Sequence, residues 1–569
     1  MNRSRISSRL SGGAVWPLLF AGLPLIIVAL AFFIPYIDAL SLSFRSDPLA
    51  GGAAPFPPRL FKILGFTLWQ ACISTAFALL VGLPGAYIIS SRHFRYKKFA
   101  RVLSAVPFAL PPIVMVLGFV LFWGNSGFIN RTLSIFFGEG AEIRILYKPG
   151  ALIFANTCYN FPLVMRLAGD AFLKIRENYE ESALSLGASP LKTALTVALP
   201  LSMPSIISAA LLVFLYCWTA FALPLVLGGG PGTTPLAVEI YRYAHTTLNY
   251  KNAGIFALAE TAVSALAFTV YLFFDKKSYR MTGHFGNSET ITARVKTACR
   301  KTGKRLQRAG TRFTSTDFIK TVYLTLILVI VLGPLLSVFA DSFLAPTGHG
   351  SSAGFSLKNW IHVDVRILSA LGRSLILASV SATISCILAL MMAKSGDSPV
   401  SRFTAIAPAV SSGIVTGLGF LSFYGQNSAR SFIALSVMHA VTALPFTFNS
   451  IYTGLRSIPQ NTLNASELFG AGYLKKLFVI EIPLCSRNIR SAWGFAACIS
   501  IGEVNLILML GMEQWETLPL YIYRAVSAYR YDMASAAGTI LIGASLLALF
   551  LSEHDMPVWH NTKSNRNKT

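Results

Sequence analysis

Four polar residues in otherwise apolar stretches are the side chains of this chain best placed to handle a charged solute. Glu503 and Asn505 lie close together late in the chain, and Glu260 and Asn160 lie within earlier apolar segments. Polar and ionisable side chains within membrane-spanning helices are costly and usually face a bundle interior or water. A carboxylate at Glu503 would lower the barrier for a cation, or it could pair with a neighbouring helix. We predict that these four residues line a path.

No arrangement typical of catalysis accompanies them. His, Asp and Ser residues do not converge at one predicted surface, and the seven cysteines show no Cys-x-x-Cys spacing. Most of the cysteines lie in apolar runs, where they serve as small packing residues. The Gly-x-x-x-x-Gly-Lys-Ser/Thr motif that cradles nucleotide phosphates is also missing from the sequence. We therefore expect no enzymatic activity, no metal and no cofactor held by the chain itself.

The elements that must position the polar residues are membrane helices. Of 569 residues, 54% are hydrophobic and only 13% are charged, and the mean hydropathy is +0.59. A soluble protein has too little buried volume for so much apolar surface. A spanning helix needs about 20 mostly apolar residues. We count twelve such segments, beginning near Val15, Leu64, Val102, Ala151, Leu201, Ala253, Thr321, Ser369, Phe403, Ser431, Ser491 and Asp532.

The net charge of +24 follows this topology and does not indicate a nucleic-acid partner. When the N-terminus is placed inside, most of the 48 Lys and Arg residues fall on the inner side, as the positive-inside rule requires. Both termini are then cytoplasmic. The basic stretch at 276–319 is either a basic amphipathic helix on the anionic lipid of the inner leaflet or a solvated linker.

A short polar sequence occurs twice between apolar stretches. Glu181-Ser182-Ala183-Leu184-Ser185-Leu186-Gly187 reappears as Asn464-Ala465-Ser466-Glu467-Leu468-Phe469-Gly470. Gly187 precedes Gly470 by as many residues as Pro200 precedes Pro483 and Pro162 precedes Pro445. This constant register predicts two homologous six-helix halves. We assign residues 1–275 to the first half, 276–319 to the linker, 320–555 to the second half and 556–569 to a cytoplasmic tail.

Each copy of the repeat predicts a helix, a turn and a second helix outside the bilayer. In the first loop, residues 171–200, Gly187 can end a helix in a left-handed cap. Ser189 and Pro190 then have the residue types of a helix cap and first turn, and Pro200 is expected to mark the return to the membrane. The second loop, residues 455–483, repeats the pattern. Such a projecting element presents a rigid surface with a shallow apolar face to a soluble partner.

The pattern of Glu181, Ala183, Gly187 and Pro200 resembles the cytoplasmic loop that defines permease subunits of ABC importers, and its presence twice resembles the fused permeases. The resemblance implies an all-α, type I importer permease fold in a bacterial inner membrane. It also implies that each loop docks into a cytoplasmic ATPase dimer, which binds the ATP. A periplasmic or lipid-anchored solute-binding protein would deliver the solute.

The second copy departs from the family pattern at three positions. Asn464 stands where an acid is usual, Ser466 replaces an alanine and Ile482 replaces a leucine. Glu467, which follows Ala465 and Ser466, would take over the role of the acid after a shift along the helix. Gly470 and Pro483 keep the pattern.

Further segments resemble the thiamine and ferric-iron permease group. They are Phe66-Thr67-Leu68-Trp69-Gln70-Ala71, the stretch from Leu227 to Tyr241, Ser500-Ile501-Gly502-Glu503, and Thr517 to Tyr523. This resemblance implies thiamine or a thiamine phosphate as the solute, with ferric iron as the alternative. A twelve-helix secondary transporter would also show two halves and a basic linker, but it has no need for the repeated loop. A polytopic membrane enzyme is disfavoured because no catalytic cluster presents itself.

Overall fold

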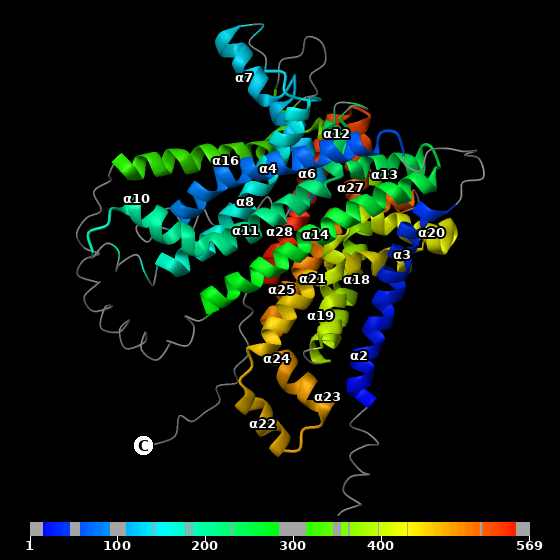
Figure 1. Cartoon of the computed structure of the whole chain (residues 1–569). Helices are drawn as coiled ribbons and strands as arrows, with labels where there is room; N and C mark the ends of the chain where they lie inside the picture. The colour runs from blue at the N-terminus through cyan, green and yellow to red at the C-terminus, as the bar shows by residue number, and fades with distance from the viewer. Residues whose placement is uncertain are drawn as a thin grey trace, which may run out of the picture.

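The computed structural model describes most of the chain (Figure 1). The described ranges are 15–45, 57–90, 110–138, 140, 143–176, 179, 183, 186–228, 230, 233–283, 315–344, 354–361, 363, 365–395, 398–429, 431–512 and 515–553. Regular structure in these ranges is entirely helical. Glu181, the greater part of the predicted linker and the tail from 556 lie outside the described residues.

In the first half, the long helices are α2 to α4, α6, α8, α11 and α14, and shorter helices connect them. Their bounds are α2 Val15–Val28, α3 Ile34–Ser41, α4 Leu60–Ile89, α6 Pro112–Trp123, α7 Phe128–Phe137, α8 Pro149–Ile175, α10 Pro190–Thr193, α11 Leu199–Trp218, α12 Ala222–Leu227, α13 Leu236–His245 and α14 Tyr250–Gly283.

The second half repeats this order of elements. Its helices are α16 Ser315–Asp341, α17 Lys358–Ile361, α18 Val365–Lys394, α19 Pro399–Ile406, α20 Gly413–Ala429, α21 Phe432–Arg456, α22 Gln460–Leu468, α23 Tyr473–Lys476, α24 Ile482–Leu484, α25 Ser486–Gly502, α26 Asn505–Leu510, α27 Leu518–Ser527 and α28 Tyr531–Glu553.

Among the described residues, nine helical segments are long and apolar enough to cross a membrane. One further pair, Pro399–Val410 and Gly413–Gly425, is bent by 105° at its break and makes ten if it counts as one span. The expected count of twelve is therefore not confirmed. The predicted spans near Ala151 and Ser491 correspond to α8 and α25, which do not meet the same criterion. The span predicted to begin near Val102 is described only from residue 110 onward. Its helix in the described part is α6, which begins at Pro112.

The first helix of each half packs against the other half. α16 lies along α6, and α3 lies along α20. At each crossing a glycine meets a proline. A Cβ on Gly118 would lie 2.3 Å from the carbonyl oxygen of Pro334, and a Cβ on Gly419 would lie 2.2 Å from that of Pro35. Small residues allow such close helix contact in membrane bundles. The sequence repeat is thus visible as a repeated contact.

Both halves contribute to one continuous apolar core. It contains Trp218 and Phe256 from the first half and Met438 and Leu506 from the second half, all fully buried or nearly so. Within each half, a hydroxyl group fixes the helix that follows the outer loop. Thr67 Oγ1 accepts the Leu236 N–H at 3.1 Å, and Ser374 Oγ accepts the Leu518 N–H at 2.8 Å. The two halves are therefore alike down to single hydrogen bonds.

Candidate coupling loops and interface cavity

The second loop forms the predicted helix–turn–helix and projects from the helix bundle (Figure 1). α22 ends at Leu468, and Gly470 adopts a left-handed conformation with φ of 75°. The Gly470 N–H donates to the carbonyl of Glu467 and the Ala471 N–H to that of Ser466, both at 3.0 Å. These bonds satisfy carbonyls at the end of α22, as in a glycine-capped helix terminus. The turn then leads directly into α23.

The first loop repeats this geometry in its described residues. Gly187 has φ of 83°, and the Ala188 N–H donates to the carbonyl of Ala183 at 3.1 Å. Ser189 caps the following helix as predicted, because its Oγ accepts the Lys192 N–H at 3.3 Å. Short side-chain oxygens at this position satisfy the free N–H groups of a first helical turn. Glu181 lies in the part of this loop that the structure does not describe.

Pro200, which was predicted to mark the return to the membrane, lies within helical structure, and so does Pro483. A π-helical turn precedes each proline, Ala194–Ala198 in the first loop and Leu477–Glu481 in the second. Each proline then occupies the second position of the next helix, α11 or α24. A π turn changes the backbone bonding pattern at the point where proline, which lacks an N–H, must be accommodated. The first loop is therefore joined to its next span by continuous helix, whereas a turn at Cys485 separates α24 from α25 after the second loop.

The tips of both loops present an apolar side chain to solvent. Leu186 is 88% exposed and Phe469 is 90% exposed, and each directly precedes the left-handed glycine. Asn464, Ala465 and Glu467 lie on exposed positions of α22, whereas Ser466 is buried. Large apolar side chains at a solvent-facing tip are typical of a protein interaction site.

Glu467 forms an ion pair with a lysine of its own loop. Lys476 Nζ lies 2.6 Å from its Oε1. The hydrogen bond from this ammonium group and its charge hold the pKa of the Glu467 carboxyl below the ordinary value. Glu467 is thus ionised and joins α22 to α23. Whether it replaces the usual acid in binding a partner stays a prediction.

A buried ion pair ties the second loop to the inner end of α18. Lys394 Nζ lies 2.8 Å from Glu481 Oε2, and the two side chains are only 14% and 3% exposed. The same ammonium lies 5.2 Å from the centroid of the Tyr473 ring, which also packs edge-on against Phe20. Three elements therefore meet at this point: α18, α23 and the N-terminal helix α2.

The first loop has a different tie at the corresponding place. The Arg176 guanidinium, after α8, lies 3.9 Å from the centroid of Tyr87 near the inner end of α4. Its Nη1 also donates to the Tyr87 carbonyl at 3.3 Å. Ala198 lines the same small pocket as Tyr87 and Arg176. It is the last residue of its π turn, and the last residue of the π turn in the second loop is Glu481. The two loops share one backbone but differ in how they are held.

A cavity of about 190 Å³ lies between the two halves. Its walls are mainly apolar and include four aromatic side chains and one carboxyl group. Contributing side chains include Tyr159 and Tyr216 from the first half and Phe446, Phe495, Glu503 and Asn505 from the second. Phe446 and Phe495 lie with ring centroids 5.4 Å apart. Pro111, at the start of α6, closes the cavity against Gly502, whose added Cβ would lie 3.1 Å from the Pro111 Cα.

Glu503 follows α25 and precedes α26. Its Oε1 accepts the N–H groups of Asn505 at 2.8 Å and Leu506 at 3.3 Å. Oε2 makes no hydrogen bond with a described residue. These bonds favour the charged carboxylate, because backbone N–H groups stabilise an anion at the start of a helix. The arrangement holds one oxygen of the Glu503 carboxyl group in a fixed position beside the aromatic rings of the cavity.

The other two predicted path residues lie away from this cavity. Asn160 is 3% exposed, and its Nδ2 donates to the Asn156 carbonyl at 2.9 Å and to Cys217 Sγ at 3.4 Å. It therefore joins α8 to α11 within the first half. Glu260 on α14 is 1% exposed and lies beside Ser412, at the break between α19 and α20. A place on the path stays a prediction for all four residues.

The structure adds residues that the sequence did not single out. The aromatic walls of the cavity come from four helices, α8, α11, α21 and α25. The pair of Lys394 and Glu481 joins residues that are distant in sequence. Aromatic residues are common in every span of this chain, so their type alone does not distinguish a cavity wall from a packed core. One usable signal was Glu481, an acid in an apolar run directly before a span.

Comparison with known proteins agrees with this geometry. Residues 78–280 match the family described as binding-protein-dependent transport system inner membrane component. Together with the helical fold and the repeated loops, this match makes the chain similar to the inner membrane components of binding-protein-dependent transport systems, the permeases of ABC importers.

Individual relatives cover nearly the whole chain. The thiamine transport system permease protein ThiP of Brucella suis is 25% identical over 92% of this chain and 93% of its own length. ThiP of Escherichia coli is 23% identical over 85% of this chain and 87% of its own. The ferric transport system permease protein FbpB of Actinobacillus pleuropneumoniae is 24% identical over 91% of this chain and 75% of its own. Both predicted substrate groups are therefore represented among the relatives.

Proposed function

We propose that this chain is the permease of an ABC importer for a small organic cation, with thiamine or a thiamine phosphate as the solute. A cytoplasmic ATPase dimer docks on the first and second loops, and a solute-binding protein delivers the solute to the opposite face. The N- and C-termini lie on the cytoplasmic side. ATP is bound by the ATPase, and this chain supplies the translocation path and the two loops on which the ATPase docks.

The observation that carries the substrate proposal is the interface cavity with its fixed carboxylate. Aromatic rings attract a cation through their negative faces, and Glu503 supplies a carboxyl group among them. Thiamine carries a cationic ring, which matches both features. Ferric iron prefers several oxygen ligands, whereas Glu503 is the one carboxylate among the residues that line this cavity. The names of the ThiP relatives point the same way.

The two loops support ATP as the energy source. A secondary transporter has no use for two projecting helical loops with exposed apolar tips, but a permease driven by an external ATPase requires them. The continuous helix through Pro200 would carry a movement of the first loop into α11, and α24 would carry a movement of the second loop to α25 across the turn at Cys485. The ties at Tyr87 and Lys394 would carry it into α4 and α18.

Uptake by a reconstituted complex tests this proposal. The full chain is placed in proteoliposomes with its ATPase and its solute-binding protein, and radiolabelled thiamine uptake is measured with and without ATP. We expect uptake that requires ATP hydrolysis and persists when ion gradients are dissipated. Uptake that survives without ATP and collapses with the ion gradient would identify a secondary transporter instead. ATP-driven uptake of ferric iron, with no uptake of thiamine, would show that ferric iron is the transported solute.

A further inference from the structure

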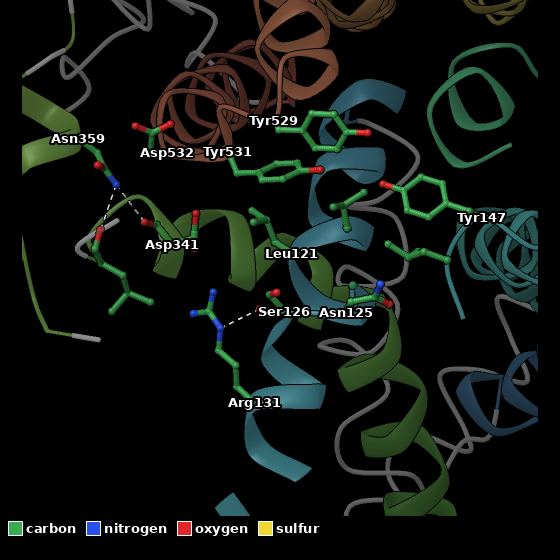
Figure 2. A pocket seen from close by; sticks show the side chains of 15 residues that line it. Leu121, Asn125, Ser126, Arg131, Tyr147, Asp341, Asn359, Tyr529, Tyr531 and Asp532 are labelled. Atoms are coloured by element: carbon green, nitrogen blue, oxygen red, sulfur yellow. Dashed lines mark hydrogen bonds between the residues drawn. The ribbon is translucent and has the colours of Figure 1, made fainter. Parts of the chain in front are cut away.

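A second, larger cavity lies at the end of the bundle opposite the two loops. Its volume is about 480 Å³, within the range of roughly 300–1,000 Å³ found for small-molecule sites. The first half contributes the end of α6, the start of α7 and the residues before α8. The second half contributes α17 and the adjoining ends of α16 and α28 (Figure 2). The topology predicts that this end faces outside.

Three tyrosines from both halves form one side of this outer pocket. Tyr147 precedes α8, and Tyr529 and Tyr531 lie in the turn between α27 and α28. The rings of Tyr529 and Tyr531 are 6.2 Å apart and nearly perpendicular. Figure 2 shows the Tyr531 and Tyr147 side chains reaching toward one another across the pocket. A cation held in this pocket would therefore lie beside three aromatic rings and their hydroxyl groups.

Two carboxylates line the other side. Asp341 ends α16 and Asp532 lies in the first turn of α28. Neither makes an ion pair with a described residue. Arg131 also lines the pocket, but its Nε donates to the Ser126 carbonyl at 2.7 Å. The lining therefore carries one net negative charge, although the chain as a whole carries +24.

The other half shows that the scaffold does not need these acids. Counting from the paired prolines Pro334 and Pro35, Leu42 stands where Asp341 stands, and the second residue of α14 is Lys251 where that of α28 is Asp532. The corresponding space is also closed. A Cβ on Gly254 of α14 would lie 2.6 Å from the Ser43 nitrogen and 2.7 Å from the Leu42 Cβ. The two carboxylates are therefore present in the second half and are not repeated at the corresponding positions of the first half.

We propose that the outer pocket binds a small organic cation, such as a quaternary ammonium or a cationic aromatic ring. Aromatic faces combined with carboxylates are the groups that recognise such cations. This inference goes beyond the proposed function, because the permease would bind the cation by itself, without its solute-binding protein and without ATP. It does not require that thiamine is the transported solute.

Direct binding tests the proposal. The purified full chain in nanodiscs is titrated with tetramethylammonium and, separately, with thiamine, and binding is measured by calorimetry. We expect saturable binding of at least one of these cations. The double variant D341N/D532N should weaken it about tenfold or more, equivalent to about 1.4 kcal/mol or more. Tyr531→Leu should weaken binding clearly, whereas Tyr531→Phe, which keeps the ring, should retain it.

Two controls separate this site from others. Asp38 is an acid in the last turn of α3, outside the pocket, and it is paired with Arg45 at 2.6 Å. Asp38→Asn should leave binding unchanged, and any component of binding that Glu503→Gln removes belongs to the interface cavity and not to the outer pocket. Thermal unfolding of each variant verifies folding. The proposal is overturned if neither cation binds saturably, or if binding survives D341N/D532N and is lost in Glu503→Gln. Reconstituted uptake is a separate measurement, so failure of the pocket and failure of the transport proposal are distinguishable.

Discussion

At the scale of single residues, Glu503 has the features expected of a group that attracts a cation. One oxygen is fixed by two backbone N–H groups, and the side chain lines the cavity between the halves. A fixed charge attracts a solute without the cost of first ordering the side chain. The surrounding rings prevent it from being screened fully by water.

Replacing Glu503 with Gln should slow uptake of a cationic solute by roughly tenfold, the factor that corresponds to about 1.4 kcal/mol. The amide keeps the size of the side chain but removes the charge. The measurement is the rate of ATP-driven uptake at saturating ATPase and equal protein amount. Glu260→Gln is the matched control, because it removes a buried acid that does not line the cavity, and it should change uptake less. Equal rates for wild type and Glu503→Gln would remove this residue from the path.

The sequence singled out Glu503 and Asn505, which line the interface cavity, but it did not reveal that Glu260 and Asn160 lie away from that cavity. All four are polar residues in apolar surroundings, so their types look alike in one dimension. Asn160 differs because Asn156 and Cys217 satisfy its amide within the first half. A partner on another helix depends on helix packing and rotation, which spacing along one helix does not reveal.

At the scale of elements, the left-handed glycines determine the shape of the loops. Gly470 has φ of 75° with nothing within 4 Å of an added Cβ, so only the backbone conformation selects glycine here. An L-residue in this conformation costs roughly 1–2 kcal/mol. Gly472, two residues on, has φ of −68° and equally open surroundings. The pair provides a test of conformation without a change in contacts.

Gly470→Ala should weaken binding of the ATPase, because the turn between α22 and α23 becomes strained. We expect a loss of about five- to thirtyfold in affinity, corresponding to about 1–2 kcal/mol. Surface plasmon resonance with the purified ATPase measures this change. Gly472→Ala should bind as wild type does. Equal loss in both variants would show that the left-handed turn is not what matters.

The tie between Lys394 and Glu481 should transmit loop movement into α18. Breaking a buried ion pair by removing one partner typically costs about 3–5 kcal/mol. Lys394→Met or Glu481→Gln should therefore lower thermal stability and leave ATP hydrolysis running with reduced uptake. The exchanged pair Lys394→Glu with Glu481→Lys should recover part of the uptake.

Lys476→Met is the control for that tie. It breaks the pair with Glu467, whose side chain is 60% exposed, and exposed pairs contribute only about 0.2–1 kcal/mol. We expect near-normal stability and coupling in this variant. If Lys394→Met behaves like Lys476→Met in both measurements, α18 does not receive the movement through this pair.

The elements themselves were largely predictable, and the exceptions have physical reasons. Apolar length identified the long spans, and Gly187 and Gly470 marked the turns. α8 and α25 are less apolar than the other predicted spans, since α8 carries Asn156 and Asn160, whose polar groups are satisfied inside the protein. The π turns before Pro200 and Pro483 were missed because proline alone predicts an interruption. A widened turn that accommodates it depends on the packing of the whole loop.

At the scale of the whole molecule, the crossed first helices hold the halves together. α3 and α16 each contact the opposite half through a glycine that admits a proline backbone. A side chain at either glycine must push the helices apart, and overpacking of this kind typically costs about 1–3 kcal/mol. The duplication could be predicted from the sequence. The packing of α3 and α16 against the opposite half could not, because a sequence repeat does not indicate which half each first helix contacts.

Gly118→Ala and Gly419→Ala should each lower the unfolding temperature of the protein in nanodiscs. Gly372→Ala on α18 is the control, because nothing lies within 4 Å of its added Cβ. That change should be neutral or slightly stabilising, since alanine is about 1 kcal/mol better than glycine in a helix. Unfolding temperatures that are the same in all three variants would contradict the close crossing.

The central claim is that two matched loops on one face of the bundle are held by an external ATPase. A photo-reactive amino acid placed at Leu186 in one variant and at Phe469 in another tests this most directly, in the purified complex that performs ATP-driven uptake. We predict crosslinks to the ATPase from both positions, with little crosslinking from a matched position at Phe136 of α7. A complex that imports its solute while neither loop crosslinks to the ATPase would contradict the account.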